Sequence, residues 1–336
     1  MVGNGGVEIM SIQLERRKAV QTDEVAGYER MLEIREFENQ INGLFAAGLI
    51  RGTTHLCLGQ EALDVALAAE LRPTDTVMAT YRGHGVALAL GLTPESVLGE
   101  IMGKTIGCCG GVGGSMHLAD MSLGLLPTSA IVGGGIPIAA GAGLAYQLLG
   151  KDSVGVAVFG DGATNIGAFH EGLNLAAIWK LPAIFICDNN VYGEYSRIDK
   201  TTPLEDLHTR AESYKMPHYA VDGMDIHATR KGIREAVERA RSGGGPTLIE
   251  AKTYRFAGHS RADKALYRPE GELEMWQKRD PIKLTEEDLV KRGLLDAAKI
   301  EKMRADMTKT IEGVVATCQA APDPTVASMF QNVFSN

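Results

Sequence analysis

Two stretches of sequence decide the fold. Residues 154–162 read VGVAVFGDG, and residues 183–190 read AIFICDNN. Each begins with an apolar run, which is typical of a strand buried on both faces of a parallel sheet. The residues between them, from about 163 to 179, have a helical pattern, so together they predict one strand–helix–strand unit. Such units cross over with one hand, and both strands should therefore end at the same edge of the sheet.

Asp161 and Asn190 follow these two strand ends, so we expect their side chains to meet at that edge. Carboxylate and amide oxygens are hard ligands suited to Mg²⁺, which commonly adds phosphate oxygens and water. Gly160 and Gly162 would let the backbone approach such a ligand closely. Each motif alone is also an ordinary turn or loop start. Together they predict a site for Mg²⁺ and a diphosphate.

The composition limits the class of protein. The chain has 336 residues, of which 45% are hydrophobic and 23% charged, as in ordinary globular proteins. Its formal net charge of −8 comes without a basic stripe, which argues against a nucleic-acid partner. No apolar run is long enough for a membrane span or has the form of a secretory signal, so no membrane association is expected. The five cysteines show no CxxC spacing, which favours a reduced, cytoplasmic protein without a zinc site or disulfides.

The alternation of strands and helices predicts an α/β fold with a doubly wound, mostly parallel sheet. After the first unit, residues 219–221 and 247–252 have the pattern of strands, and residues 226–241 form an amphipathic stretch between them. The C-terminal part has a helical pattern that we expect to begin at Thr285. We therefore expect one domain built around a sheet, with additional segments attached to it.

Four segments follow from these patterns. We expect a flexible N-terminal segment over residues 1–22, an α/β domain over 23–284 and a helical C-terminal arm over 285–336. Within the domain, residues 255–281 carry many charges and few apolar residues. A loop of that length inside a compact domain is either disordered or a functional lid, and we interpret it as an active-site lid loop.

The glycine-rich segment 103–114 leaves two interpretations open. Its backbone amides could face an anion, or it could be a mobile surface loop. The small residues of 138–146 predict a helix that packs closely, and we expect another subunit as its partner.

From about Tyr28 to Leu284 the chain resembles the α subunit of the first component of 2-oxo-acid and acetoin dehydrogenase complexes. The two strand ends resemble the thiamine diphosphate fingerprint of that family, which begins Gly-Asp-Gly and closes with Asn-Asn. The resemblance implies a thiamine diphosphate-binding fold, specifically its diphosphate-binding module. The other matching motifs are RGTTH (51–55), GQE (59–61), YRGHG (81–85), GGSMH (113–117), IVG (131–133) and YRFAGHS (254–260).

The resemblance also implies roles for individual residues. Asp161, the side chain of Asn190 and the backbone carbonyl of Tyr192 would hold Mg²⁺ against the cofactor diphosphate. Arg82 would bind the diphosphate, for which a planar guanidinium is well suited. Catalytic roles fall to His55 and to a histidine of the lid, His259. The further cofactor contacts that it implies are Tyr81, Ala130, Val132, Gly162, Ala163 and His259.

Four other histidines have simpler explanations. His84 and His117 could be catalytic or could cap loops, and the sequence leaves both interpretations open. His170 and His227 lie in helical stretches, where we expect structural roles.

The resemblance implies partners as well. In the family, the glutamate that protonates the aminopyrimidine belongs to a separate pyrimidine-binding module, and this chain is too short to carry both modules. We therefore expect a β subunit to supply that glutamate in an α₂β₂ heterotetramer. The acyl group would then pass reductively to the lipoyl arm of a partner acyltransferase.

The sequence limits the choice of substrate less than it limits the family. The segment 107–120 resembles acetoin dehydrogenase α subunits, whereas residues 221–225 and 258–260 resemble pyruvate dehydrogenase. Residues 128–130 and 261–265 depart from the usual family sequences at places where substrate or cofactor is met. Acetoin is preferred over pyruvate, with branched-chain oxo acids third. A split transketolase-like enzyme and a non-catalytic α-like binding protein remain as alternatives.

Overall fold

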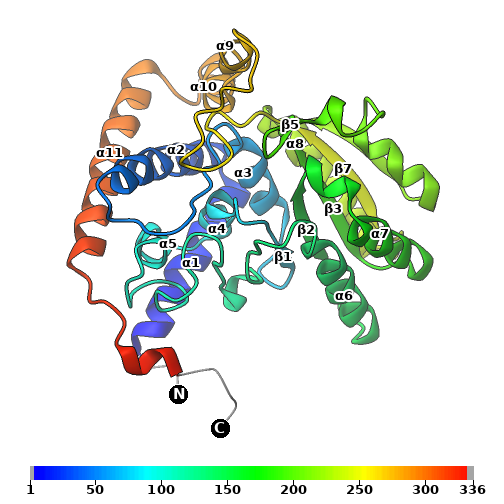
Figure 1. Cartoon of the computed structure of the whole chain (residues 1–336), viewed down its shortest axis with the longest axis horizontal. Helices are drawn as coiled ribbons and strands as arrows, with labels where there is room; N and C mark the ends of the chain where they lie inside the picture. Colours follow the sequence, from blue (N-terminus) through cyan, green and yellow to red (C-terminus); the bar gives the residue numbers. More distant parts are fainter. Residues whose placement is uncertain (1–3, 331–336) are drawn as a thin grey trace.

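The computed structural model describes residues 4–330, and a five-stranded parallel sheet lies at its centre (Figure 1). The strand order is β1-β2-β3-β7-β6, and every neighbouring pair is parallel. This confirms the predicted α/β class with a parallel sheet. The strands of the sheet are β1 (Thr76–Met78), β2 (Gly155–Gly160), β3 (Ala183–Asn189), β6 (His218–Asp222) and β7 (Thr247–Lys252), and β4 (Tyr192–Gly193) and β5 (Ser196–Arg197) form a separate short hairpin.

Helices cover both faces of the sheet, as the predicted double winding requires (Figure 1). None of the described helices is long and apolar enough to cross a membrane. The α-helices are α1 (Asn4–Thr22), α2 (Glu24–Ala46), α3 (Glu61–Glu70), α4 (His84–Leu90), α5 (Pro94–Ile101), α6 (Gly135–Leu148), α7 (Gly167–Trp179), α8 (Ile226–Arg241), α9 (Glu272–Gln277), α10 (Pro281–Lys291) and α11 (Ala297–Ala320). Short 3₁₀ helices are η1 (Met121–Leu123), η2 (Asp161–Asn165), η3 (Ile198–Lys200), η4 (Leu207–Tyr214) and η5 (Val326–Phe330).

The apolar side chains of β2 contribute to two hydrophobic cores, one on each face of the sheet. Val156 and Val158 pack into the larger core with helices α1 to α5, α8, α10 and α11, whereas Ala157 and Phe159 pack into the smaller core with α6, α7 and η4. Side chains alternate between the two faces of a strand, so both faces of β2 must be apolar. This explains why its sequence is a continuous apolar run and not an alternating one.

The register of β2 and β3 brings their carboxyl ends together. Gly160 pairs with Asp188, so the next residues along both strands emerge at the same edge of the sheet. Asp161 begins η2 there, and Asn190 begins the loop that leads into the β4–β5 hairpin. The sheet therefore positions the two motifs that the sequence singled out.

The expectation of a flexible segment over residues 1–22 is wrong for residues 4–22, which form helix α1; residues 1–3 lie outside the described part of the chain. Arg17 of this helix is 1% exposed and donates to the carbonyls of Leu123 (2.6 Å) and Arg72 (2.8 Å). Burying an arginine is costly unless its donors find acceptors, and these two carbonyls accept from both terminal nitrogens of Arg17. The segment is held by polar contacts more than by an apolar stripe, which is why the hydrophobic pattern missed it.

The C-terminal boundaries also differ from those expected. Helix α10 begins at Pro281, with Asp280 as its N-cap, so the predicted boundary at 284/285 falls inside a helix. Proline in the first turn after a capping aspartate is a normal helix start. The lid 255–281 is not wholly a loop, because it contains α9. Helix α11 packs against α2 and α5 with Ile311 in the core, so it is part of the domain; residues 331–336 of the predicted arm lie outside the described residues.

Candidate active site

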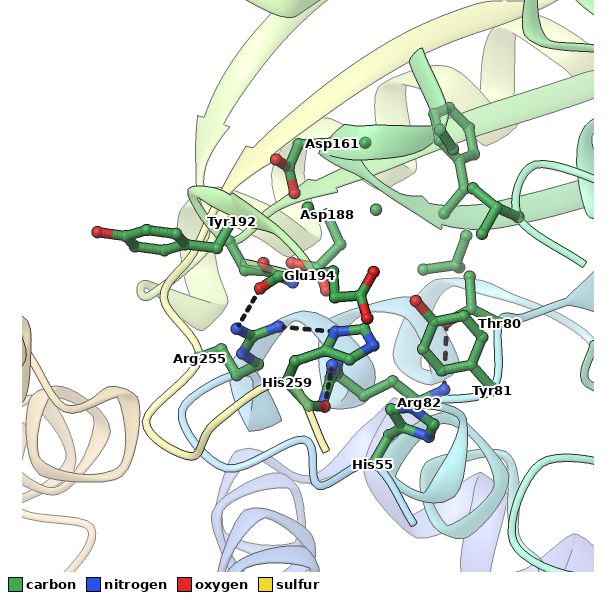
Figure 2. Close-up of a pocket in the computed structure, with 18 of the residues that line it drawn as sticks. His55, Thr80, Tyr81, Arg82, Asp161, Asp188, Tyr192, Glu194, Arg255 and His259 are labelled. Atoms are coloured by element: carbon green, nitrogen blue, oxygen red, sulfur yellow. Dashed lines mark hydrogen bonds between the residues drawn. The ribbon is translucent and has the colours of Figure 1, made fainter. Parts of the chain in front are cut away.

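A cavity of about 540 Å³ opens at the carboxyl edge of β2 and β3 (Figure 2). It is lined by segments far apart in the sequence: the loop before α3, the end of β1, the start of α6, the β2 and β3 ends, the β4–β5 hairpin and the lid. Every residue to which the resemblance assigned a catalytic, cofactor-binding or metal-binding role lines this one cavity. These residues are His55, Tyr81, Arg82, Ala130, Val132, Asp161, Gly162, Ala163, Asn190, Tyr192 and His259.

Asp161 and Asn190 face this cavity with oxygens that have no partner. Asp161 is 1% exposed and Asn190 is 5% exposed, yet Asp161 Oδ2 and Asn190 Oδ1 accept no hydrogen bond from any described residue. A buried polar atom without a partner is costly, so both oxygens are available to a ligand that enters this cavity. Oxygen atoms of a carboxylate and an amide fit Mg²⁺.

The backbone after Asn190 is turned sharply. Val191 has a φ of 77°, which a β-branched residue rarely adopts. Its N–H donates to Asn189 Oδ1 (3.1 Å) and its carbonyl accepts from Ile198 N (2.9 Å), so contacts on both sides hold the turn. A Cβ on Gly162 would lie 3.3 Å from the Cα of Gly193, so the two backbones approach closely at these glycines. The turn thus brings the hairpin against the end of β2.

Two arginines border the cavity without an ion-pair partner among the described residues. Arg82 donates to the carbonyls of Leu56 (2.6 Å) and His259 (3.0 Å). Arg255 donates to Tyr267 Oη (2.8 Å) and to the carbonyl of Glu194 (3.3 Å). Burial, and then the charge of Arg255, lowers the pKa of Arg82 to about 10; burial also lowers the pKa of Arg255. These guanidinium groups can accept an anionic ligand such as a diphosphate.

The pKa values of the carboxylates at the strand ends are shifted in the opposite direction, upward. Burial, and then the charge of Asp188, raises the pKa of Asp161 to about 7. Burial raises the pKa of Asp188 to about 6, although its oxygens accept from Gln60 and Thr253. A cation beside Asp161 would favour its charged form and reverse the shift. Both sets of shifts therefore fit a site for a metal ion together with an anion.

An aromatic cluster forms the other wall of the cavity. The ring of His55 lies 4.3 Å from that of Tyr81 and 5.0 Å from that of His259, measured between centroids. Burial, followed by the charge of Arg82, lowers the pKa of His55 to about 3 and that of His259 to about 4. Both imidazoles are therefore neutral at neutral pH, and each can donate or accept a hydrogen bond.

The lid is tied down around His259. Asp263 Oδ2 accepts from the backbone N–H of His259 (2.6 Å) and from Tyr267 Oη (2.8 Å). Arg268 donates to the carbonyls of Arg255 and Ala257, both at 2.6 Å. These contacts fix the backbone that carries His259 at the rim of the cavity.

Sequence reasoning missed several groups that line the cavity. Asp188 adjoins the Asn-Asn motif and could have been found from its place at the end of β3. From the sequence, Arg255 was counted only among the charged residues of the lid loop. Asp64 and Gln60 each bury a side-chain oxygen without a partner, and helical spacing alone gave no sign of it. These missed cavity residues are Gln60, Asp64, Asp188, Glu194 and Arg255.

The glycine-rich segment faces an anion, but that anion belongs to the chain itself. Glu100, fully buried, accepts the backbone N–H groups of Cys109 (2.8 Å), Gly111 (2.8 Å), Gly113 (2.6 Å) and Gly114 (3.1 Å). Backbone amides turned toward one carboxylate form an anion-binding nest. The segment is therefore neither a free phosphate loop nor an untethered surface loop.

The other histidines lie outside the residues that line the cavity. His84 is fully buried; its Nδ1 contacts Glu38 Oε1 and its Nε2 contacts Ser115 Oγ, each at 2.8 Å. Ser115 precedes Met116, which lines the cavity, so His84 ties that segment to α2. His117 is exposed, and His170 contacts Tyr214 Oη at the surface.

Comparison with known proteins gives consistent matches over nearly the whole chain. A family model described as "Dehydrogenase E1 component" matches residues 29–327. The acetoin:2,6-dichlorophenolindophenol oxidoreductase α subunits of Bacillus subtilis and Cupriavidus necator are 41% and 39% identical, each over 91% of this chain and 92% of the relative. The pyruvate dehydrogenase E1 component α subunit of Rhizobium meliloti is 35% identical over 93% of this chain and 90% of the relative.

Proposed function

Because this chain belongs to the dehydrogenase E1 component family, we propose that it is the α subunit of a thiamine diphosphate-dependent oxidoreductase that cleaves acetoin. The observation that carries this proposal is the single cavity lined by unpartnered Asp161 and Asn190 oxygens and by two arginines without carboxylate partners. That combination of a metal site and an anion site is what a metal-bound diphosphate needs.

The chain's own residues would divide the binding of cofactor and metal between them. Asp161 Oδ2, Asn190 Oδ1 and the carbonyl of Tyr192 would hold Mg²⁺, and Arg82 would bind the diphosphate. When bound, thiamine diphosphate supplies the electron sink for breaking a bond next to a carbonyl. His55 and His259 lie neutral beside Tyr81, where they can form hydrogen bonds with a substrate.

Acetoin is the preferred substrate and pyruvate the second candidate. The relatives named for acetoin are 41% and 39% identical to this chain, whereas those named for pyruvate reach 35% and 37%. Because these sequence identities differ little, a substrate assay decides the order of the two candidates. In either case the acceptor would be the lipoyl group of a partner acyltransferase.

A β subunit would complete the site, as an α₂β₂ heterotetramer. Apolar residues next to the cavity and on α6 and α7 are exposed, which is typical of a surface that another protein covers. Three of them, Ile131 (71% exposed), Val132 and Ile138, lie at or just after Ala130, a proposed cofactor contact. The β subunit would also bring the glutamate that activates the cofactor. The remaining exposed apolar residues of this face are Leu148, Leu149, Leu175, Ile178 and Trp179.

Reconstitution with the β subunit tests the proposal. The purified pair, supplied with thiamine diphosphate and Mg²⁺, is expected to reduce 2,6-dichlorophenolindophenol with acetoin faster than with pyruvate or branched-chain oxo acids. The α chain alone is expected to be inactive. Ketol transfer between sugars without dye reduction would favour a transketolase-like enzyme, and failure to bind the cofactor even with the β subunit would favour a non-catalytic protein.

A further inference from the structure

Glu194 is an exposed glutamate on the wall of the cavity. Two other carboxylates there, Asp64 and Asp161, are buried, and Asp188 is bonded to Gln60 and Thr253. The side chain of Glu194 forms no hydrogen bond with the described residues. Figure 2 shows it directed into the cavity, toward the wall formed by Tyr81 and His259. It is thus the carboxylate on the side of Tyr81 and of His259, a proposed catalytic residue.

The backbone holds Glu194 in this position. It follows β4 and has a φ of 55°, in the left-handed region that non-glycine residues seldom adopt. Its carbonyl accepts from Arg255 (3.3 Å), so the main chain turns toward that arginine. Residues held in sparsely populated conformations occur often at functional sites, where surrounding contacts maintain them. Tyr192, two residues earlier, is buried and bonded to Glu272, which anchors the near side of the turn.

The two candidate substrates differ in the proton that their reactions release. Cleavage of acetoin breaks the bond between its carbonyl carbon and its carbinol carbon. The electron pair of that bond would pass to the electron sink that bound thiamine diphosphate supplies. The carbinol O–H electron pair becomes the second C–O bond of acetaldehyde, and the hydroxyl proton must pass to a base. Pyruvate instead loses CO₂, which leaves without giving up a proton and requires a carboxylate to enter the cavity.

We propose that Glu194 is the base that accepts the carbinol proton and that its carboxylate also disfavours anionic 2-oxo acids, so that the site takes neutral 2-hydroxyketones. This deepens the proposed function and rests on it. A carboxylate within reach of the carbinol can accept its proton, whereas a second carboxylate in the same cavity meets like-charge repulsion. One residue would therefore set both the reaction and the substrate class.

Glu194→Gln tests the role in turnover, because glutamine keeps the shape and removes the charge and the basicity. In the α–β complex loaded with thiamine diphosphate and Mg²⁺, kcat/KM for acetoin is expected to fall by about 10²-fold or more. The value for pyruvate is expected to stay the same or rise. Glu205→Gln is the matched control, since Glu205 is exposed on the following loop and does not line the cavity. It should change neither value.

Binding without turnover gives an independent measurement. The complex is loaded with a cofactor analogue that cannot add to a carbonyl, and acetoin and pyruvate are titrated by calorimetry. The wild-type complex should bind acetoin in preference to pyruvate, and Glu194→Gln should bind pyruvate at least several-fold more tightly than the wild type. An equal loss of both substrates in Glu194→Gln, or unchanged acetoin turnover, would overturn the role of Glu194.

Failure of the proposed function is distinguishable from failure of this inference. If the wild-type complex turns over neither substrate, the proposed function fails, and the binding preference for a neutral hydroxyketone still tests Glu194. If the wild type cleaves acetoin and Glu194→Gln does so equally well, only the inference fails.

Discussion

The two sides of the cavity are built in different ways. On the side of β2 and β3, polar groups are buried, and Asp161 Oδ2 and Asn190 Oδ1 have no partner among the described residues. On the side that leads into α6, apolar groups are exposed, among them Ile131, Val132 and Ile138. Buried polar atoms without partners and exposed apolar side chains both indicate surfaces that are complementary to something else.

The difference lies in what each side requires. Lone carboxylate and amide oxygens need a cation, and unpaired arginines need an anion, so the polar side calls for an ionic ligand. Exposed apolar side chains need another apolar surface, so the other side calls for a protein. Substitutions on the polar side should therefore change cofactor binding with assembly intact, and substitutions on the apolar side should do the reverse.

The largest effect is expected from Asp161→Asn. Removing the carboxylate deletes the one charged residue of the proposed metal site, and Mg²⁺-dependent thiamine diphosphate binding by the α–β complex should weaken by roughly 10³-fold. Assembly with the β subunit should be unchanged. Calorimetry measures the affinity, and Asp199→Asn, at an exposed aspartate paired with Arg197, serves as the control. Retained metal-dependent binding would place the metal elsewhere.

Ile178→Asp tests the apolar side. Ile178 is 64% exposed on α7, and a charge there should weaken association with the β subunit by about 10²-fold, because a buried interface would have to desolvate it. Size-exclusion chromatography with both chains measures assembly. The control Val290→Asp changes another exposed apolar residue, on α10, and should assemble normally. Normal assembly of Ile178→Asp would remove α7 from the proposed interface.

Arg82→Gln returns to the polar side with a smaller effect. Losing a charge-assisted bond to the diphosphate should weaken cofactor binding by about 10- to 100-fold. Arg82→Lys keeps the charge but not the planar fork, and should fall between the two. Equal affinities for all three proteins, measured by calorimetry, would show that Arg82 does not contact the cofactor.

The last prediction concerns the pH dependence of the stability of the metal-free α chain, not a binding affinity. The folded pKa of Asp161 is about 7, above its unfolded value, so the folded state binds more protons between the two values. The free energy of unfolding should therefore fall as the pH rises from about 4 to 7, by at most roughly 1.4 kcal/mol per pH unit from this group. Denaturant unfolding across that range should show a shallower fall in Asp161→Asn. The same slope in both proteins would contradict the burial of an unpartnered carboxylate.

Those parts of the fold that depend on local patterns could be predicted from sequence. The β2 and β3 runs end in Gly-Asp-Gly and Asn-Asn, and one crossover helix fixes both ends at one edge. Polar burial between distant segments could not be predicted. The side chain of Arg17 donates to carbonyls far along the chain, and the carboxylate of Glu100 accepts from backbone amides of the glycine-rich segment.

The site divides in the same way. Residues within motifs were named in advance, whereas Asp64 and Glu194 were not, because their significance depends on tertiary contacts. Asp64 lies in an ordinary helical pattern and becomes notable only through its burial. Glu194 becomes notable through a left-handed backbone and its place on the cavity wall. Neither property can be recognised from a single sequence.

Calorimetric titration of thiamine diphosphate tests the central claim that this chain provides the metal-diphosphate half of a shared site. Titrations are made into the α chain alone and into the α–β complex, each with and without Mg²⁺. We expect tight binding of one cofactor per α–β pair only when both Mg²⁺ and the β subunit are present. Equally tight binding to the α chain alone, or binding that is independent of Mg²⁺, would contradict the account.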